Sequence, residues 1–357
     1  MEQDAGTVAD RDQVFEEELV ASLTDRSLHL ILLPTEQCNF RCTYCYEDFS
    51  VGRMTAETVR GVKRLLERRL DDLEQLNVSW FGGEPMVARA VVEDVSSFVV
   101  ESVADRPHVR YAADMTTNGY LLDAAKAEGL ARLGVRSYQI SLDGPREIHD
   151  TTRRRADGGA SFERIWRNLL SIRGSDLDIR VLLRVHLTPA NLPAMRAFLP
   201  EVRDTFLDDA RFSVRLKPVE RMGGPHNDEI DVIAHDMRAD VQEELGALIR
   251  MPARSAQDSP KEEACYAARP NSLVIRANGT VAKCTVALSD PSNSIGRLTP
   301  EGTLEVDNDR LSPWVRGWAS GDWDAVKCPY AGLPRSKDRL LQITPASPRT
   351  GIEMTGR

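Results

Sequence analysis

Three cysteines with short, fixed spacing stand out in this 357-residue sequence. Cys38, Cys42 and Cys45 follow one another with three and then two residues between them. Three soft thiolates close together favour zinc or an iron-sulfur cluster. A structural zinc site is normally closed by a fourth ligand, yet the nearest histidines are His29 and the distant His108. The pattern therefore predicts a metal centre with one open coordination position.

A glycine pair follows the next short apolar run, in the order Phe81, Gly82, Gly83, Glu84, Pro85. Glycine lets exposed backbone approach a ligand without interference from a Cβ atom. Most such pairs are ordinary turns, so the motif alone is weak evidence. Its position after a predicted strand, downstream of the cysteines, strengthens it.

Together these motifs resemble the radical S-adenosylmethionine (SAM) superfamily, as does the aromatic Tyr44 before the last cysteine. The resemblance implies that the three cysteines hold a [4Fe-4S] cluster whose fourth iron binds SAM. It also implies that Gly82, Gly83 and Glu84 form the loop that meets the methionyl amino group. The expected chemistry is reductive cleavage of SAM to a 5'-deoxyadenosyl radical, which removes a hydrogen atom from substrate.

Two later strand ends and one arginine extend this resemblance. Asn118 ends the run Met-Thr-Thr-Asn-Gly, and Ser141 and Asp143 belong to Ser-Leu-Asp-Gly. By resemblance all three face SAM, with Ser141 at its ribose or carboxylate, and Arg153 pairs with the carboxylate, for which a guanidinium fork is suited. Simple turn chemistry is the alternative for Asn118 and Asp143. Either of the two arginines that follow Arg153 is an alternative to it.

The other three cysteines lie in the C-terminal part of the chain. Cys265, Gly279 and Cys284 resemble the opening of the SPASM domain and of its shorter relative, the twitch domain. Cys328 adds one thiol, but the further cysteines of a full SPASM domain are missing. The resemblance implies one auxiliary [4Fe-4S] cluster on Cys265, Cys284 and Cys328. Cys328 stays open between a ligand and a buried free thiol.

Strand and helix patterns alternate along most of the chain, which is typical of a parallel α/β fold. We predict a partial (β/α)6 barrel with a small C-terminal α+β domain. The predicted strands cover 29–33, 78–81, 109–115, 137–142, 179–187 and 210–216. The predicted helices cover 55–76, 87–103, 124–133, 161–172, 192–202 and 230–249. A hairpin is expected around Asn278 and Gly279.

The predicted organisation has five parts. An N-terminal segment, 1–28, contains one short helical pattern. The barrel covers 29–250, a linker 251–264, the auxiliary-cluster domain 265–335 and a tail 336–357.

Composition restricts the partners and the compartment. The chain has 46 basic and 55 acidic residues, a net charge of -9, so nothing favours nucleic acid or an anionic membrane. No apolar stretch approaches the roughly 20 residues of a membrane span, and the N-terminus is unlike a signal sequence. We expect a cytoplasmic protein with metal-bound rather than disulfide-bonded cysteines.

The resemblance favours a maturase that modifies a ribosomally made peptide through an oxidative thioether or carbon-carbon crosslink. The rivals are an anaerobic sulfatase-maturase-like enzyme, an aminoglycoside-type small-molecule dehydrogenase, and a non-enzymatic iron-sulfur or zinc scaffold. Thr285 after Cys284 weakens the sulfatase alternative, because an acidic base is expected there. The implied partners are a precursor peptide, a flavodoxin or ferredoxin as electron donor, and either a separate leader-binding protein or direct docking of the leader.

Overall fold

The computed structural model describes residues 2–224, 227–250 and 264–333. Ten of the described strands form one sheet in the spatial order β12-β11-β10-β9-β1-β3-β4-β5-β7-β8. The strands of the barrel are β1 (Ser27–Leu32), β3 (Gln75–Trp80), β4 (Arg110–Thr117), β5 (Val135–Leu142), β7 (Arg180–Leu187) and β8 (Phe212–Pro218). These six are neighbours and run parallel. The predicted α/β barrel architecture is therefore confirmed.

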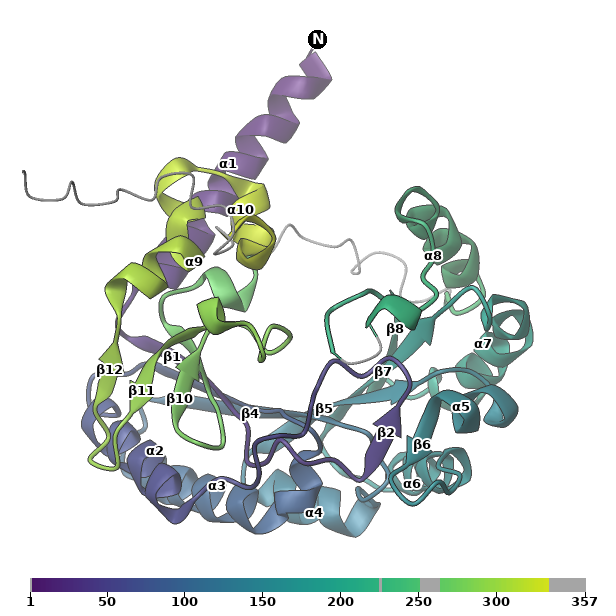
Figure 1. Ribbon diagram of the computed structural model, residues 1–357, viewed down its shortest axis with the longest axis horizontal. Coiled ribbons are helices and arrows are strands. Elements are labelled where there is room, and N and C mark those ends of the chain that lie inside the picture. The colour runs from purple at the N-terminus through teal and green to yellow at the C-terminus, as the bar shows by residue number, and fades with distance from the viewer. Residues whose placement is uncertain (1, 225–226, 251–263, 334–357) are drawn as a thin grey trace, which may run out of the picture.

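Helices join these strands and cover the convex face of the curved sheet (Figure 1). They are α2 (Ala56–Arg69), α3 (Arg89–Ala104), α4 (Ala124–Arg132), α5 (Arg146–Thr152), α6 (Phe162–Arg173), α7 (Leu192–Phe206) and α8 (Arg238–Ala247). Alternate strand residues such as Leu30, Val78 and Ile140 are buried under them in one core. Because this face is apolar and covered, the polar side chains of the same strands are left on the concave face.

Two predicted helices are longer than the observed ones. The helix predicted over 55–76 ends at Arg69, and Leu76 lies in β3. The helix predicted over 230–249 begins only at Arg238. Ile230 and Ile233, which suggested the earlier start, are buried in a loop. In each case an apolar residue outside the helix happened to continue its period, so spacing alone misplaced the boundary.

A small second sheet was not predicted. It contains β2 (Phe40–Cys42) and β6 (Arg153–Arg155), which pair antiparallel so that Cys42 lies opposite Arg153. The Thr43 backbone N–H also donates to the Thr152 carbonyl at 2.9 Å. Three-residue strands carry no periodic signal, so only the folded chain shows this pairing. It holds the cysteine loop across the end of the barrel.

Four further strands continue the main sheet beyond β1. They are β9 (Ser272–Ile275), β10 (Thr280–Ala282), β11 (Ser294–Leu298) and β12 (Leu304–Val306). β9 and β10 form the expected hairpin, in which Gly279 has a φ of +82°. β9 pairs parallel with β1, so one continuous sheet joins the predicted barrel to the C-terminal part. The predicted domain boundaries remain predictions.

Helices at the two ends of the chain pack together. α1 (Glu2–Leu23) is longer than its short apolar pattern suggested. Its Phe15 ring contacts the rings of Trp318 in α9 (Asn308–Ser320) and Trp323 in α10 (Trp323–Lys327), with centroids 5.3 and 5.1 Å apart. No helix among the described residues could cross a membrane. Apart from Ala264, the predicted linker lies outside the described residues, as does the predicted tail.

Candidate functional site

One cavity lies where the parallel strands end, on the concave face of the sheet. It has a volume of about 160 Å³ and is lined by both the cysteine loop and the strand ends. Ligands of α/β barrels gather at this carboxyl edge. Among its lining residues are Cys38, Cys42, Tyr44, Cys45, Gly82, Gly83, Asn118, Ser141 and Arg153. The structure thus brings together most of the predicted site residues, while Glu84 and Asp143 lie behind this lining.

The glycine pair packs against the start of the cysteine loop. Gly82 has a φ of +114°, and a Cβ atom there would lie 2.3 Å from the Thr35 carbonyl oxygen. A Cβ atom on Gly83 would lie 2.5 Å from the carbonyl oxygen of Gln37. The Glu84 backbone N–H donates to that same carbonyl at 3.1 Å. Both glycines are therefore required for close contact between two loops of the chain, besides any contact with a ligand.

We expect Gly83→Ala to displace the cysteine loop, because the added methyl meets backbone atoms that have no space to move. Overpacking of this kind costs about 1–3 kcal/mol. Iron content after anaerobic reconstitution should fall to less than half of the wild-type value. Gly129→Ala in α4 is the matched control, since its Cβ would meet nothing within 4 Å. Equal iron loading of both variants would contradict this account.

Glu84 is fully buried and uses both carboxylate oxygens within the protein. Oε1 accepts hydrogen bonds from the Thr117 hydroxyl at 2.7 Å and the Met86 N–H at 3.0 Å. Oε2 accepts from the Asn118 N–H at 2.7 Å. Burial raises the pKa of Glu84, although these donors oppose the rise. Glu84 therefore fixes the ends of β3 and β4 relative to each other.

Asn118 connects this edge to the first cysteine. Its Nδ2 donates to Asn39 Oδ1 at 2.8 Å and lies 3.9 Å from the Cys38 sulfur. Its Oδ1 accepts from the Tyr120 N–H at 3.0 Å. Asn118 thus makes the contacts of a turn residue and also orients the cysteine loop.

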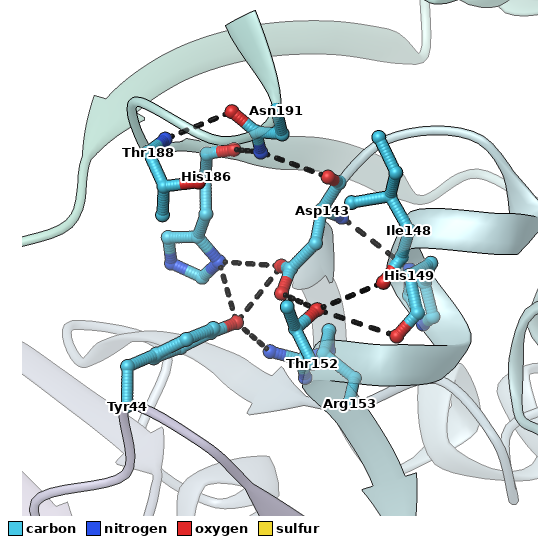
Figure 2. A network of polar contacts seen from close by, with 9 residues as sticks. All are labelled: Tyr44, Asp143, Ile148, His149, Thr152, Arg153, His186, Thr188 and Asn191. Atoms are coloured by element: carbon cyan, nitrogen blue, oxygen red, sulfur yellow. Dashed lines mark hydrogen bonds and ion pairs between the residues drawn. The ribbon is translucent and has the colours of Figure 1, made fainter. Parts of the chain in front are cut away.

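A network of polar contacts anchors Tyr44 to the opposite strands (Figure 2). The Tyr44 hydroxyl donates to Asp143 Oδ1 at 2.8 Å and accepts from Arg153 Nη1 at 2.8 Å. His186 Nδ1 lies 3.1 Å from the same Asp143 oxygen, and the Thr152 hydroxyl donates to Oδ2 at 2.6 Å. Burial alone would raise the pKa of Asp143, but His186 and Arg153 hold it below its ordinary value. Asp143 and Arg153 thus both hydrogen-bond to the hydroxyl of Tyr44.

Three of the predicted SAM contacts lie in different surroundings. Asp143 is 2% exposed and its carboxylate is surrounded by protein donors. Arg153 is the buried member of its arginine run and lines the cavity, whereas Arg154 is exposed. The Nε atom of Arg153 is buried and has no hydrogen-bond partner among the described residues. Ser141 lines the cavity at the end of β5. This geometry suits Ser141 and Arg153 for ligand contact and Asp143 for positioning Tyr44.

We expect Tyr44→Phe to destabilise the metal-free protein by about 1–3 kcal/mol, because Arg153 loses its acceptor and a buried charge is left poorly paired. Urea unfolding followed by circular dichroism measures the change. Tyr120→Phe is the control. It removes a hydroxyl that makes no hydrogen bond to any described residue and keeps a ring that packs on Phe40 at 5.8 Å. A loss for Tyr44→Phe no larger than for this control would contradict the anchoring role.

The first three thiols suit a cationic cluster. Burial raises the pKa of the Cys38 and Cys42 thiols, and that of Cys45 to about 12. They would stay protonated unless a metal supplied positive charge, and metal binding deprotonates such thiols. In the described ranges no three His, Cys, Asp or Glu side chains are placed so that they could hold a single metal ion as they stand.

The second set of thiols is also brought together by the fold. The Cys265 N–H donates to the Val326 carbonyl at 2.9 Å, close to Cys328. Cys284 follows β10. Burial raises the pKa of the Cys265 thiol, and the nearby Cys284 and Cys328 raise it further. Cys328 is exposed, so the alternative that it is a buried thiol is wrong. The influence of Cys284 and Cys328 on Cys265 shows that the three thiols lie near one another.

A buried ion pair connects the cysteine loop to the hairpin of β9 and β10. Arg276 Nε and Nη2 donate to the two oxygens of Glu36 at 3.0 and 2.5 Å. Glu36 is 2% exposed. Two hydrogen bonds between the guanidinium and the carboxylate fix both the distance and the relative orientation of the two side chains. The two cysteine sets are thereby held in a defined relation.

Four functional candidates were missed from the sequence. Glu36, His186, Arg276 and Arg184 were not singled out. The signal for the two residues in β7 was a polar side chain at alternate positions of an otherwise apolar strand. No such signal marks Glu36 or Arg276, because their partners are far apart in the chain.

Comparison with known proteins identifies the class. Residues 32–192 match the Radical SAM superfamily. A GTP 3',8-cyclase of Stenotrophomonas maltophilia is 30% identical over 239 residues, which cover 66% of this chain and 68% of that protein. The chain belongs to the radical SAM superfamily, and membership implies a [4Fe-4S] cluster and SAM.

Other relatives match more loosely. An uncharacterized protein of Methanocaldococcus jannaschii is 24% identical over 73% of this chain and 86% of its own length. The GTP 3',8-cyclase of Aeromonas hydrophila is 32% identical, but the match covers only 41% of that protein.

Solved structures share the fold at low identity. The structure of anSMEcpe with bound AdoMet and the Cp18Cys peptide has a TM-score of 0.60 at 18% identity, covering 82% of each chain. Streptococcus suis SuiB bound to the precursor peptide SuiA has a TM-score of 0.56 at 14% identity, covering 91% of this chain and 71% of that one. Both likenesses establish the fold.

Proposed function

We propose that this radical SAM enzyme modifies a ribosomally made peptide by an oxidative crosslink, either a thioether or a carbon-carbon bond. The carrying observation is the presence of two cysteine sets, one in the cavity and one after β10, with the Glu36–Arg276 pair linking the cysteine loop to the hairpin of β9 and β10. The fold shared with structures that hold peptides supports the choice of substrate.

Each cavity residue has a role in this proposal. Cys38, Cys42 and Cys45 hold the cluster. Gly82 and Gly83 let their loop lie against the cysteine loop, and they line the space for the methionyl end of SAM. When bound, the cluster and SAM supply a carbon radical that removes a hydrogen atom from substrate. Three side chains complete the SAM site by facing it or by holding its walls, namely Asn118, Ser141 and Arg153.

Positioning residues fix the walls of that cavity relative to one another. Tyr44 joins the cysteine loop to β5 and β7 through Asp143 and His186. Glu84 joins β3 to β4. A reactive site built on such fixed contacts excludes water and limits where substrate can lie.

The auxiliary site completes the redox balance. Removal of one hydrogen atom leaves a substrate radical, and closing a crosslink releases one more electron and a proton. We assign the electron to an auxiliary [4Fe-4S] cluster on Cys265, Cys284 and Cys328, and the proton to solvent. A flavodoxin or ferredoxin then carries electrons to and from the enzyme, and a separate leader-binding protein or the barrel itself receives the leader peptide.

The test is incubation of the reconstituted enzyme with SAM, a reductant and a candidate precursor peptide. Tandem mass spectrometry should show loss of two hydrogens at one pair of residues, together with 5'-deoxyadenosine. An unchanged peptide mass with one inverted stereocentre would replace crosslinking by epimerisation.

A second candidate is cyclisation of GTP, favoured by the match to the Stenotrophomonas maltophilia enzyme over two thirds of its length. The same reaction mixture with GTP in place of peptide decides between them. Consumption of GTP that depends on SAM would select the nucleotide and exclude the peptide proposal.

A further inference from the structure

One basic side chain of the cavity has no ion-pair partner among the residues that the structure describes. Three basic side chains line it, namely Arg153, Arg184 and Lys217. Arg153 donates to Tyr44, and Lys217 pairs with Glu220 at 2.5 Å. Arg184 makes no hydrogen bond or ion pair with any residue in the described ranges. Glu47 and Glu220 also line the cavity, but neither forms an ion pair with Arg184. A half-buried guanidinium without such a pair is stabilised by a ligand that supplies negative charge.

The strand register places Arg184 at the floor of the cavity. It lies in β7 directly opposite Ser141 of β5 on one side and Arg215 of β8 on the other. Burial lowers the pKa of Arg184, and Arg215 and Arg153 lower it further, while Tyr46 and Tyr44 oppose them. The charged side chains that act most strongly on Arg184 are thus two further arginines, in a protein whose net charge is -9.

Arg184 lies away from the expected amino end of SAM. The glycine loop follows β3, and β7 is three strands further along the sheet. Neighbouring strands are about 4.8 Å apart, so the two strands are separated by about 14 Å. The carboxylate of SAM is attached to the same carbon as its amino group and stays close to the glycine loop. Arg153 is already assigned to that carboxylate, so Arg184 is available for a second anion.

We propose that Arg184 is a specificity-determining residue that binds an acidic side chain of the peptide substrate. This inference rests on the proposed peptide-modifying function and deepens it. The planar guanidinium of an arginine can donate two parallel hydrogen bonds to one carboxylate. Such a contact would hold an aspartate or glutamate against β7 and direct a neighbouring residue toward the SAM end of the cavity.

The test is affinity selection from a synthetic random decapeptide library on the full reconstituted protein with SAM, under anaerobic conditions. Peptides retained by the wild-type protein should be enriched in Asp and Glu by about tenfold over the input, the effect expected of a charged hydrogen-bonded pair. Because the whole chain is acidic, unspecific retention would disfavour such peptides. Arg184→Gln should lose the enrichment, and Arg184→Lys should recover part of it.

Arg215→Gln is the matched control. It removes the same charge from the neighbouring strand, and Arg215 is exposed and does not line the cavity. Its peptides should stay enriched in acids. The inference is overturned if wild-type peptides show no acidic enrichment, if Arg184→Gln keeps it, or if GTP displaces the peptides in an Arg184-dependent way.

Two further readouts separate this inference from the proposed function. The Kd for SAM is measured on Arg184→Gln, and a rise of more than about fivefold would assign Arg184 to SAM instead. Formation of 5'-deoxyadenosine is measured on the wild-type protein. If the wild type forms none, the radical SAM function itself fails; if it forms the product without acidic enrichment, only the role of Arg184 fails.

Discussion

Replacement of Cys38, Cys42 and Cys45 by alanine should abolish 5'-deoxyadenosine formation. All three thiols line one cavity, and SAM cleavage needs a cluster that three alanines cannot hold. Chromatographic detection of 5'-deoxyadenosine after reduction with dithionite measures the effect, and activity should fall by at least about 1000-fold, to background, as expected when the cofactor that carries the chemistry is lost.

The control for this variant is Cys265→Ala with Cys284→Ala, which leaves the cavity intact. Cleavage of SAM by the triple variant after anaerobic reconstitution would refute the assignment of the cavity cysteines. Zinc without iron in anaerobically purified wild-type protein would refute it as well.

The double variant Cys265→Ala, Cys284→Ala should separate SAM cleavage from crosslink formation. We expect about eight irons per chain in the wild type and about four in this variant, four for each cubane cluster. SAM cleavage should persist while the peptide crosslink is lost, because the electron released on bond closure has no acceptor. Iron analysis and mass spectrometry of the peptide measure the two effects.

Removal of Cys328 alone tests its open assignment. If Cys328 is a ligand, Cys328→Ala should also reduce the iron content toward four. A wild-type value near four irons would remove the auxiliary cluster from the proposal and leave Cys265, Cys284 and Cys328 as structural thiols.

The amino-acid sequence predicts the barrel because local patterns determine it. Each parallel strand carries its own apolar run, such as His29 to Leu33, and each is followed by a helix with its own period. The cysteine spacing and the glycine pair are likewise local, so the sequence alone was enough to predict residues for a SAM site. Errors occur at helix ends, as at Arg69 and Arg238, where an apolar neighbour continues the period by chance.

The roles of those residues depend on contacts between distant parts of the chain. Asp143 and Arg153 both belong to motifs that suggest SAM contact, yet in the structure they share the hydroxyl of Tyr44. Glu36 meets Arg276 across most of the sequence. No periodicity or spacing reports such pairs, because they form only when separate strands are aligned.

The sequence by itself determined which chemistry this protein has, through three cysteines, a glycine loop and six β/α units. The tertiary structure decided which charged side chains are neutralised and which remain available to a ligand. The physical reason is that the partner of a buried charge is selected by strand register and loop docking. Arg184 illustrates this, since it lies in β7 between Ser141 and Arg215 and forms no ion pair with a described residue.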